Sequence, residues 1–185
     1  MATHPARRGW SYAEFARLPD DGNRYEVIGG ELYVTPGPRR VHQEVAARLQ
    51  FELRGFATVQ QRLGPVLGPL DVIFAEGDYL APDLMFIRED HLGYETERGF
   101  EGPPDLVVEV LSPTTALRDR TIKRERYAAY GVPEYWIVDV EARRVEVYRP
   151  GDEGPSIHTE RLAWHPVEGG PVLELDLGEL FADLD

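Results

Sequence analysis

The chain contains no cysteine and no long apolar run. The missing cysteine excludes a disulfide framework and a zinc–thiolate site. No segment is apolar over the length needed to span a bilayer, and the opening residues MATHPARRGWSYAEF lack the apolar centre of a signal peptide. We therefore expect a protein with no membrane association and a cytoplasmic location.

Basic residues are scarce relative to acidic ones. The 185 residues include 20 Lys and Arg against 33 Asp and Glu, which gives a formal net charge of -13. Proteins that bind nucleic acid passively usually carry a basic surface, so this balance argues against such binding. An acidic balance instead suits a protein that gathers carboxylates around a cation.

One short segment departs from this acidic balance. LRDRTIKRER, residues 117–126, brings together Arg118, Arg120, Lys123, Arg124 and Arg126. Such a charge run is most often a solvated helix face. If the protein binds nucleic acid, this segment is the place for the contact, through Arg118, Arg120 and Arg124.

The chain shows no internal repeat, low-complexity tract or interior linker, and its length predicts a single domain over 1–185. Capping, turn and periodicity signals predict the order of the elements. The expected helices are a short one from Ser11, a long one over 39–56 that stops at Gly55, and one over 115–131 closed by Gly131. The expected strands are a hairpin over 24–34 turning at Gly29–Gly30, then 64–75, 80–87, 104–111, 133–139 and 143–149, with one or two more strands and a helical turn in the tail 158–181.

The strand 105–111, the helix 116–130 and the strand 134–139 form a predicted βαβ crossover. The two strands should therefore be parallel, with a right-handed connection. Parallel strands are normally covered on both faces, which explains their unbroken apolar sequences. We expect an α/β (α+β) fold with a mixed central β-sheet flanked by helices.

Glu109 interrupts the apolar strand PDLVVEVL. It shares a face with Val107 and Leu111, so its side chain should point into a core layer or a cleft. A buried carboxylate without a partner is costly, so it must take up a proton or find a positive partner. A structural salt bridge, for instance to an arginine of the 117–126 segment, explains Glu109 as well as catalysis does.

A second carboxylate occupies a similar position. Asp83 opens another short apolar strand, after Pro82, which fits the start or the edge of a strand. Two neighbouring strands would then direct carboxylates into one cleft, where a divalent cation relieves their repulsion. Mg²⁺ commonly takes one or two protein carboxylates, so Asp83 and Glu109 are candidate ligands for Mg²⁺ or Mn²⁺. A metal held there could polarise a phosphodiester and activate a water.

The predicted crossover helix offers a positive partner for this site. Asp119, Lys123 and Tyr127 follow one another at spacings of four residues and so share one face of the helix. If that face packs over the sheet, Lys123 can stabilise charge in the transition state. An exposed helix with a simple Asp–Lys pair is the alternative.

The sequence resembles the PD-(D/E)XK nuclease superfamily. It is closest to a branch of restriction-endonuclease-like proteins long known as a domain of unknown function. The resemblance covers about 10–150 and leaves a β-rich extension at the C-terminal end. The segments that carry it are RYEVIGGELY, the HQ that opens a helix, PDLMFI, GPPDLVVEVLSPTT, the helix with spaced D, K and Y, and GVPEYWIVD.

The resemblance implies a restriction-endonuclease-like core with Asp83 and Glu109 as metal ligands. The superfamily expects a lysine where this chain has Leu111, and Lys123 is the residue that could replace it. Glu26 matches the acidic residue of the RYE motif. Hairpin geometry places it opposite the apolar face, where an ordinary solvent-facing residue would also fit.

Two polar residues open the long helix. By the same resemblance, His42 could orient Glu26 or a metal-bound water, with Gln43 beside it. A polar first turn without a functional role explains both residues equally well.

These observations favour a Mg²⁺-dependent endonuclease that hydrolyses DNA and acts as a homodimer, as enzymes that cut two strands commonly do. The alternative is a catalytically degenerate protein on the same fold that binds nucleic acid or another protein. A two-carboxylate glycosidase is weaker, because no aromatic platform for a sugar is evident.

Overall fold

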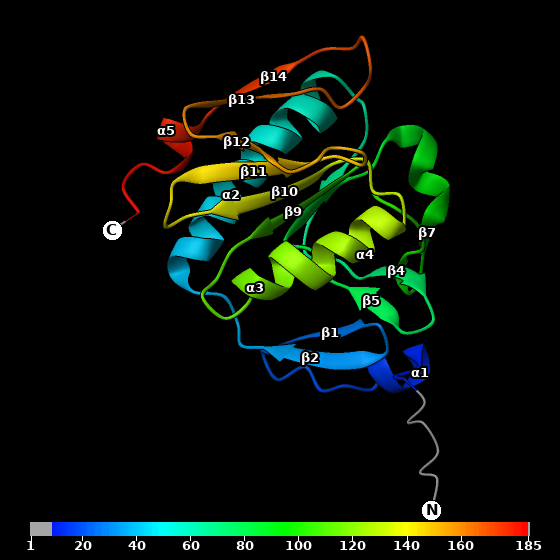
Figure 1. The fold of residues 1–185 in the computed structure, drawn as a ribbon. Coiled ribbons are helices and arrows are strands. Elements are labelled where there is room, and N and C mark those ends of the chain that lie inside the picture. Colours follow the sequence, from blue (N-terminus) through cyan, green and yellow to red (C-terminus); the bar gives the residue numbers. More distant parts are fainter. Residues whose placement is uncertain (1–8, 185) are drawn as a thin grey trace, which may run out of the picture.

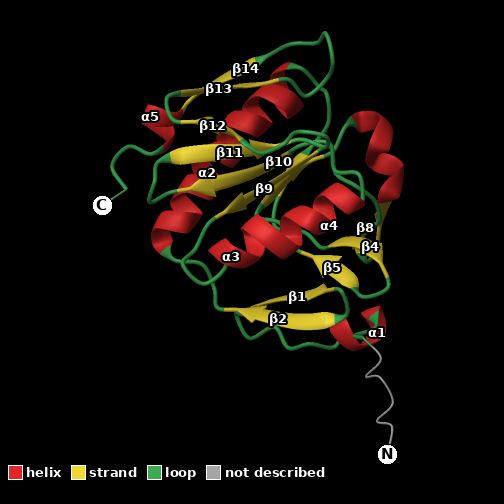
Figure 2. Ribbon diagram, in the orientation of Figure 1, coloured by secondary structure: helices red, strands yellow, loops and turns green. Residues whose placement is uncertain are grey.

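A computed structural model describes residues 9–184. Two six-stranded sheets and a two-stranded hairpin account for the strands of this part of the chain. Figure 1 shows the two sheets one above the other, with the segment α3–α4 running between them. Figure 2 shows the helices placed around and between the sheets.

The central sheet has the strand order β12-β11-β10-β9-β6-β3. β9 and β10 are parallel and their neighbours are antiparallel, so the sheet is mixed, as predicted. The strands on the two sides of the crossover helix are therefore adjacent and parallel, as the βαβ reading required. Its strands are β3 (Val66–Leu67), β6 (Leu84–Phe86), β9 (Leu106–Val110), β10 (Tyr135–Asp139), β11 (Arg144–Tyr148) and β12 (Ser156–His158).

The second sheet was not predicted as a separate layer. Its order is β2-β1-β5-β4-β8-β7, and the expected hairpin forms one of its edges. Gly29 and Gly30 make the hairpin turn with φ of 61° and 83°, which glycine adopts without strain. Its strands are β1 (Arg24–Ile28), β2 (Glu31–Thr35), β4 (Val72–Ala75), β5 (Asp78–Leu80), β7 (Glu95–Thr96) and β8 (Gly99–Phe100).

The tail packs as a small separate layer. β13 (Arg161–Trp164) and β14 (Leu173–Asp176) form the hairpin, and α5 (Leu177–Leu180) follows. The main core joins this layer and α2 (Arg40–Arg54) to one face of the central sheet, around Trp136 and Trp164. The described residues contain no helix with the length and apolar character needed to cross a membrane.

Two helices differ from the prediction. The long helix does not stop at Gly55, whose φ of -54° is helical; the chain continues as a π-helical segment, η1 (Gly55–Gln60). The crossover helix is α3 (Ala116–Arg118), a π-helical segment η3 (Asp119–Lys123) and α4 (Arg124–Ala129). Gly131 closes it with a φ of 83°, as predicted. The short helix α1 (Tyr12–Phe15) begins at Ser11 with a capping box to Glu14.

The expected strand 64–75 is two strands in different sheets. β3 pairs with β6 in the central sheet, and β4 pairs with β5 in the second sheet. Gly68 lies between them, and a Cβ there would come within 2.1 Å of the Asp83 carbonyl oxygen. The chain thus changes sheets beside Asp83, which only a glycine can allow at this distance.

Candidate active site

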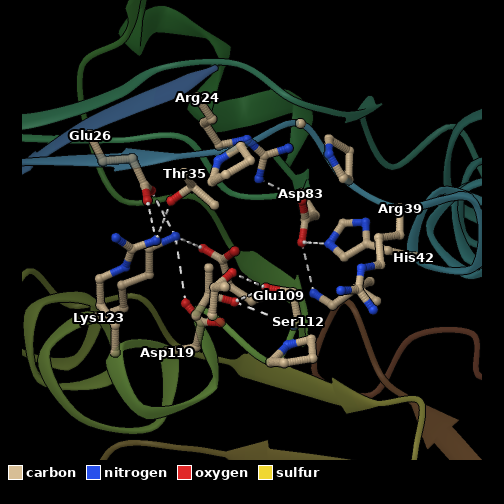
Figure 3. A pocket seen from close by; sticks show the side chains of 18 residues that line it. Arg24, Glu26, Thr35, Arg39, His42, Asp83, Glu109, Ser112, Asp119 and Lys123 are labelled. Carbon is tan, nitrogen blue, oxygen red and sulfur yellow. Dashed lines mark hydrogen bonds and ion pairs between the residues drawn. The ribbon is translucent and has the colours of Figure 1, made fainter. Parts of the chain in front are cut away.

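A cavity of about 180 Å³ lies between the two sheets, beside the start of the crossover helix (Figure 3). Residues from several separate parts of the chain line it. They come from β1, the segment 35–39, the first turn of α2, the start of β6 at Asp83, the end of β9, and the segment 112–123. Four of the lining side chains are carboxylates: Glu26, Asp83, Glu109 and Asp119.

Sheet pairing brings Asp83 and Glu109 to the same point. β6 and β9 are antiparallel neighbours in which Leu84 lies opposite Val108. One step further along each strand, Asp83 comes beside Glu109. The Val110 backbone N–H donates to Asp83 Oδ2 at 2.8 Å, which fixes the carboxylate against β9. Both predicted metal ligands therefore line one cavity.

Asp83 is held as a charged group. Arg24 Nη1 donates to Oδ1 at 2.6 Å, and His42 Nε2 lies 3.1 Å from Oδ2. Burial by itself would raise the pKa of Asp83, but the His42 hydrogen bond and the Arg24 charge outweigh it and lower the pKa to about 2. The Asp83 carboxylate is thus ionised at neutral pH and already neutralised by protein groups.

Glu109 is paired with the predicted lysine. Lys123 Nζ donates to Glu109 Oε1 at 2.7 Å and the Tyr127 hydroxyl donates to the same oxygen at 2.9 Å. Burial, and then the nearby Asp119, Asp83 and Glu26 carboxylates, raise the pKa of Glu109 to about 8, although the Lys123 charge opposes this. Glu109 is therefore both a member of a buried salt bridge and a carboxylate of the cavity. Its positive partner is a lysine, whereas the sequence had suggested an arginine.

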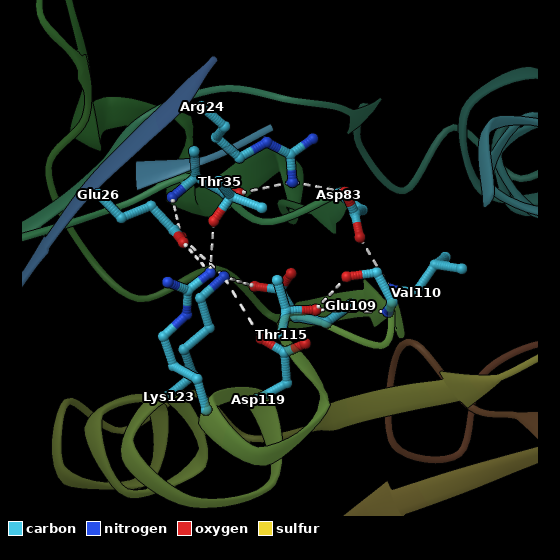
Figure 4. Close-up of polar contacts among 12 residues, drawn as sticks. Arg24, Glu26, Thr35, Asp83, Glu109, Val110, Thr115, Asp119 and Lys123 are labelled. Carbon is cyan, nitrogen blue, oxygen red and sulfur yellow. Dashed lines mark hydrogen bonds and ion pairs between the residues drawn. The ribbon is translucent and has the colours of Figure 1, made fainter. Parts of the chain in front are cut away.

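Lys123 is 2% exposed and joins three carboxylates (Figure 4). Its Nζ is 2.7 Å from Glu26 Oε1 and 3.8 Å from Asp119 Oδ1, in addition to the Glu109 contact. Burial would lower the pKa of Lys123, but the charges of Glu109, Glu26 and Asp119 outweigh it and raise the pKa. The face formed by Asp119, Lys123 and Tyr127 thus packs over the sheet, and the exposed-helix alternative is wrong for it.

Glu26 points away from the apolar face of the hairpin, as predicted, but not to solvent. The opposite face of the hairpin, which carries Glu26, lies over the cavity, and Glu26 is only 1% exposed. Its Oε1 accepts from Lys123 and from the Ala81 backbone N–H, at 2.7 and 3.1 Å. Arg118 Nη2 lies 3.5 Å from Oε2, which has no hydrogen-bond donor among the described residues.

The two residues that open α2 separate in the structure. His42 lines the cavity and contacts Asp83, whereas the resemblance had suggested that it orients Glu26 or a metal-bound water. Gln43 is exposed and does not line the cavity. A helical step of about 100° between neighbours turns the one side chain into the site and the other away from it.

The three arginines proposed for nucleic-acid contact also separate. Arg118 lines the cavity and donates to the Thr35 hydroxyl at 2.7 Å. Arg120 is bound to Asp139 and Glu146, both at 2.7 Å, and Arg124 lies over the Tyr148 ring. Neither Arg120 nor Arg124 lines the cavity, so the predicted cluster is not one continuous basic surface.

A family model described as "Putative restriction endonuclease", that of the Uma2 family, matches residues 12–181. The chain belongs to the Uma2 family. A solved structure from Anabaena variabilis ATCC 29413, described as "a putative nuclease belonging to DUF820", has the same fold. The two share 24% identity with a TM-score of 0.78, over 95% of this chain and 99% of that one. A search of curated proteins found no match.

These findings confirm the family and the fold class predicted from the sequence. Within this Uma2 protein, the lysine expected on the strand is absent, and Leu111 is partly buried against an apolar cluster that includes Tyr127. The lysine that lines the cavity is Lys123 on the crossover helix, fourteen residues after Glu109.

Several lining residues were missed by the sequence analysis. They are Arg24, Thr35, Arg39, Ser112, Thr114 and Thr115. Arg24 had a usable signal, because it lies two residues before Glu26 on the same strand and so on the same face. Thr35 ends β2 directly opposite Arg24, so strand pairing places it on the same face. The others precede or follow regular elements, where no periodicity predicts the direction of a side chain.

The residues of the cavity fit a single hard cation. Within the described part of the chain, no three His, Cys, Asp or Glu side chains are grouped as a complete metal site. Two carboxylates suffice for Mg²⁺, which keeps waters and substrate oxygens as its other ligands. Both hydrogen bonds that described residues donate to Glu109 go to Oε1, which leaves Oε2 for such a ligand.

Proposed function

We propose that this Uma2 protein is an endonuclease that hydrolyses DNA phosphodiester bonds with Mg²⁺ or Mn²⁺. One observation carries the proposal: two carboxylates from adjacent strands, Asp83 and Glu109, line one cavity with an ammonium group 2.7 Å from the second. Carboxylates and a fixed cation together are the chemistry that phosphodiester hydrolysis requires. Membership of a family described as restriction endonucleases agrees with it.

Each residue would have a distinct role. A cation held by Asp83 and Glu109 would polarise the phosphoryl group and lower the pKa of a water. Lys123 would donate to a phosphoryl oxygen as negative charge develops, while Glu26 and Asp119 keep the ammonium group in place. Tyr127 and His42 would fix the two metal-binding carboxylates through the hydrogen bonds described above.

A plasmid-nicking assay with Mg²⁺ or Mn²⁺ tests this function. We expect wild-type protein to nick supercoiled DNA only with metal present, and Asp83→Asn and Glu109→Gln to lose both cleavage and metal binding. Arg149→Gln is the control, since Arg149 pairs with Glu134 and does not line the cavity. Wild-type protein that binds Mn²⁺ but never cuts DNA or RNA would overturn the proposal.

The degenerate binding module remains the second candidate. The observation in its favour is that Asp83 already has Arg24 and His42, and Glu109 already has Lys123, so their charges are balanced without a metal. Duplex binding by a protein that takes up no Mn²⁺ would support this candidate.

The homodimer, the single domain and the cytoplasmic location belong to the same proposal. Cutting both strands of a duplex suits two sites related by a two-fold axis. Size-exclusion chromatography with light scattering tests the dimer, and a single calorimetric unfolding transition tests the domain.

A further inference from the structure

Arg24 lies at the wall between two cavities. It is on β1, two residues before Glu26 and on the same face of that strand. Its side chain is 24% exposed and lines both the cavity described above and a wider neighbouring one of about 580 Å³. Figure 3 shows its guanidinium directed at Asp83. Arg24 thus has open space next to it as well as a buried partner.

The hydrogen bonds of Asp83 leave one oxygen available for a cation. Oδ2 accepts from the Val110 N–H at 2.8 Å and faces His42 Nε2 at 3.1 Å. A carboxylate oxygen has two lone-pair positions, so those two groups fill Oδ2. Among the described residues, Oδ1 accepts one hydrogen bond, from Arg24 Nη1 at 2.6 Å. A cation on Asp83 must therefore bind at the oxygen that Arg24 holds.

A metal ion and Arg24 cannot share that oxygen without cost. The guanidinium is always charged, and a divalent ion a few Å away repels it strongly in a partly dry cavity. The pKa of Arg24 is raised: burial opposes this, but the charges of Asp83, then Glu109 and Glu26, outweigh it. Asp83 is thus the acidic partner that Arg24 contacts, and the Ala81 carbonyl oxygen, 3.5 Å from Nη1, is its other acceptor.

We propose that Arg24 is a displaceable cation, which occupies Asp83 in the metal-free protein, leaves it when a divalent ion binds, and then binds a phosphate oxygen of the nucleic acid. This rests on the proposed function, because it takes Asp83 as a metal ligand. The exchange keeps the cavity near neutrality before the metal binds and supplies an additional positive charge to the substrate afterwards. A guanidinium suits the second role, since its geometry matches phosphate.

The test measures binding rather than turnover. Calorimetric titration of Mn²⁺ into metal-free Arg24→Gln, without DNA, should show affinity roughly tenfold or more above wild type, because the competing cation is gone. With Ca²⁺ present, a fluorescent DNA duplex should bind the variant more weakly, with a salt slope smaller by about one phosphate contact. Arg149→Gln is the matched control, a half-exposed arginine on a mostly buried glutamate, and should change neither quantity.

Opposite changes in the two affinities support the proposal, since a merely structural arginine would weaken both. Equal Mn²⁺ affinity of wild type and Arg24→Gln overturns it and leaves the nuclease proposal intact. Absence of Mn²⁺ binding in both proteins overturns both proposals. Duplex binding that does not weaken overturns the phosphate role. If Arg24→Gln does not fold, Arg24→Met, which keeps the aliphatic part of the side chain without its charge, decides: tighter Mn²⁺ binding than wild type supports displacement, and unchanged binding overturns it.

Discussion

Lys123 has two possible kinds of importance, which the structure allows an experiment to separate. It is buried, it contacts Glu26 and Glu109 at 2.7 Å, and it is the ammonium group of the cavity. Removing one partner of a buried ion pair costs about 3–5 kcal/mol, because the other charge stays buried. The stability effect and the catalytic effect must therefore be measured independently.

We expect Lys123→Met to lower cleavage by a factor on the order of 10² to 10³, as the loss of one preorganised donor does. It should also lower the melting temperature, because Glu26 and Glu109 lose the cation that they share. Lys123→Arg should restore little cleavage, because a planar guanidinium does not replace a compact ammonium. Nicking rates and thermal melts of the same preparations provide both quantities.

Arg124→Met is the matched control for Lys123→Met. Arg124 is the next residue on the same helix but lies over Tyr148, outside the cavity. Its substitution should leave the rate of cleavage close to wild type. Equal cleavage by wild type and Lys123→Met would remove Lys123 from the site and favour the degenerate binding module.

Glu109 predicts how the stability of the metal-free protein depends on pH. Its pKa in the folded state is about 8, against 4.5 for an unperturbed glutamate. Between these values the folded protein keeps a proton that the unfolded chain releases, so the free energy of unfolding falls as the pH rises from about 4.5 to 8. Asp83, whose pKa is lowered, affects the free energy of unfolding only below about pH 4. There its protonation destabilises the fold.

Glu109→Gln should reduce this slope, of which Asp119, whose pKa is also raised by burial, keeps a part. Denaturant unfolding in EDTA at several pH values should show a flatter profile for the variant between about pH 5 and 8, and a stability no lower than wild type near pH 8. Lys123 keeps Glu26 as a partner in the variant. A large loss of stability at pH 8 would instead show that the ionised Glu109–Lys123 pair holds the fold together.

At the scale of elements, the site depends on where strands change sheets. β3 and β4 are consecutive in the chain but belong to different sheets, and Gly68 between them packs against the Asp83 backbone. The two π-helical segments, η1 and η3, extend or interrupt helices that the sequence predicted as regular. η3 is the segment that carries both Asp119 and Lys123, so the irregular turn presents the polar face of the crossover helix to the cavity.

Two glycine-to-alanine substitutions test this arrangement. Gly68→Ala should lower the free energy of unfolding by about 1–3 kcal/mol, because the new Cβ meets the Asp83 carbonyl at 2.1 Å. It should also weaken Mn²⁺ binding by moving Asp83. Gly55→Ala, which has helical φ and no atom within 4 Å of its Cβ, should instead gain roughly 0.5–1 kcal/mol. Urea unfolding measures the free energy of unfolding of both variants. Equal changes in the two variants would contradict the close approach at Gly68.

At the scale of the whole molecule, charge opposes the proposed substrate. The net charge of -13 repels a polyanion, and Arg120 is already committed to Asp139 and Glu146. The positive groups that line the cavity are Arg24, Arg39, Arg118 and Lys123. Few phosphates can be contacted there at once.

We therefore expect weak DNA binding that falls steeply with salt. Each neutralised phosphate should contribute about -0.9 to the slope of log affinity against log salt concentration. Arg118→Gln should reduce that slope by about one unit, and Arg120→Gln should leave it unchanged because Arg120 lies outside the cavity. Fluorescence anisotropy between 50 and roughly 200 mM salt measures it. Binding that is insensitive to salt would point to a ligand other than nucleic acid.

The sequence by itself determined most of the elements and three members of the candidate site. Glu109 and Lys123 were predictable because strand alternation and helical spacing are local rules, and a βαβ unit packs its helix over its own strands. That β6, which follows Asp83, lies beside β9 is a finding of the structure. The capping box at Ser11, the turn at Gly29–Gly30 and the end at Gly131 follow from equally local chemistry.

Only the tertiary structure decided what covers each face. Glu26 sits on the predicted side of its hairpin, but whether that side meets water or a cavity depends on a layer formed by residues far away in the chain. The same holds for His42 at Asp83, for the pairing of Arg24, and for the distribution of Arg118, Arg120 and Arg124 among different partners. Local periodicity fixes the direction of a side chain relative to its own element, whereas its partner is fixed by how distant elements pack together.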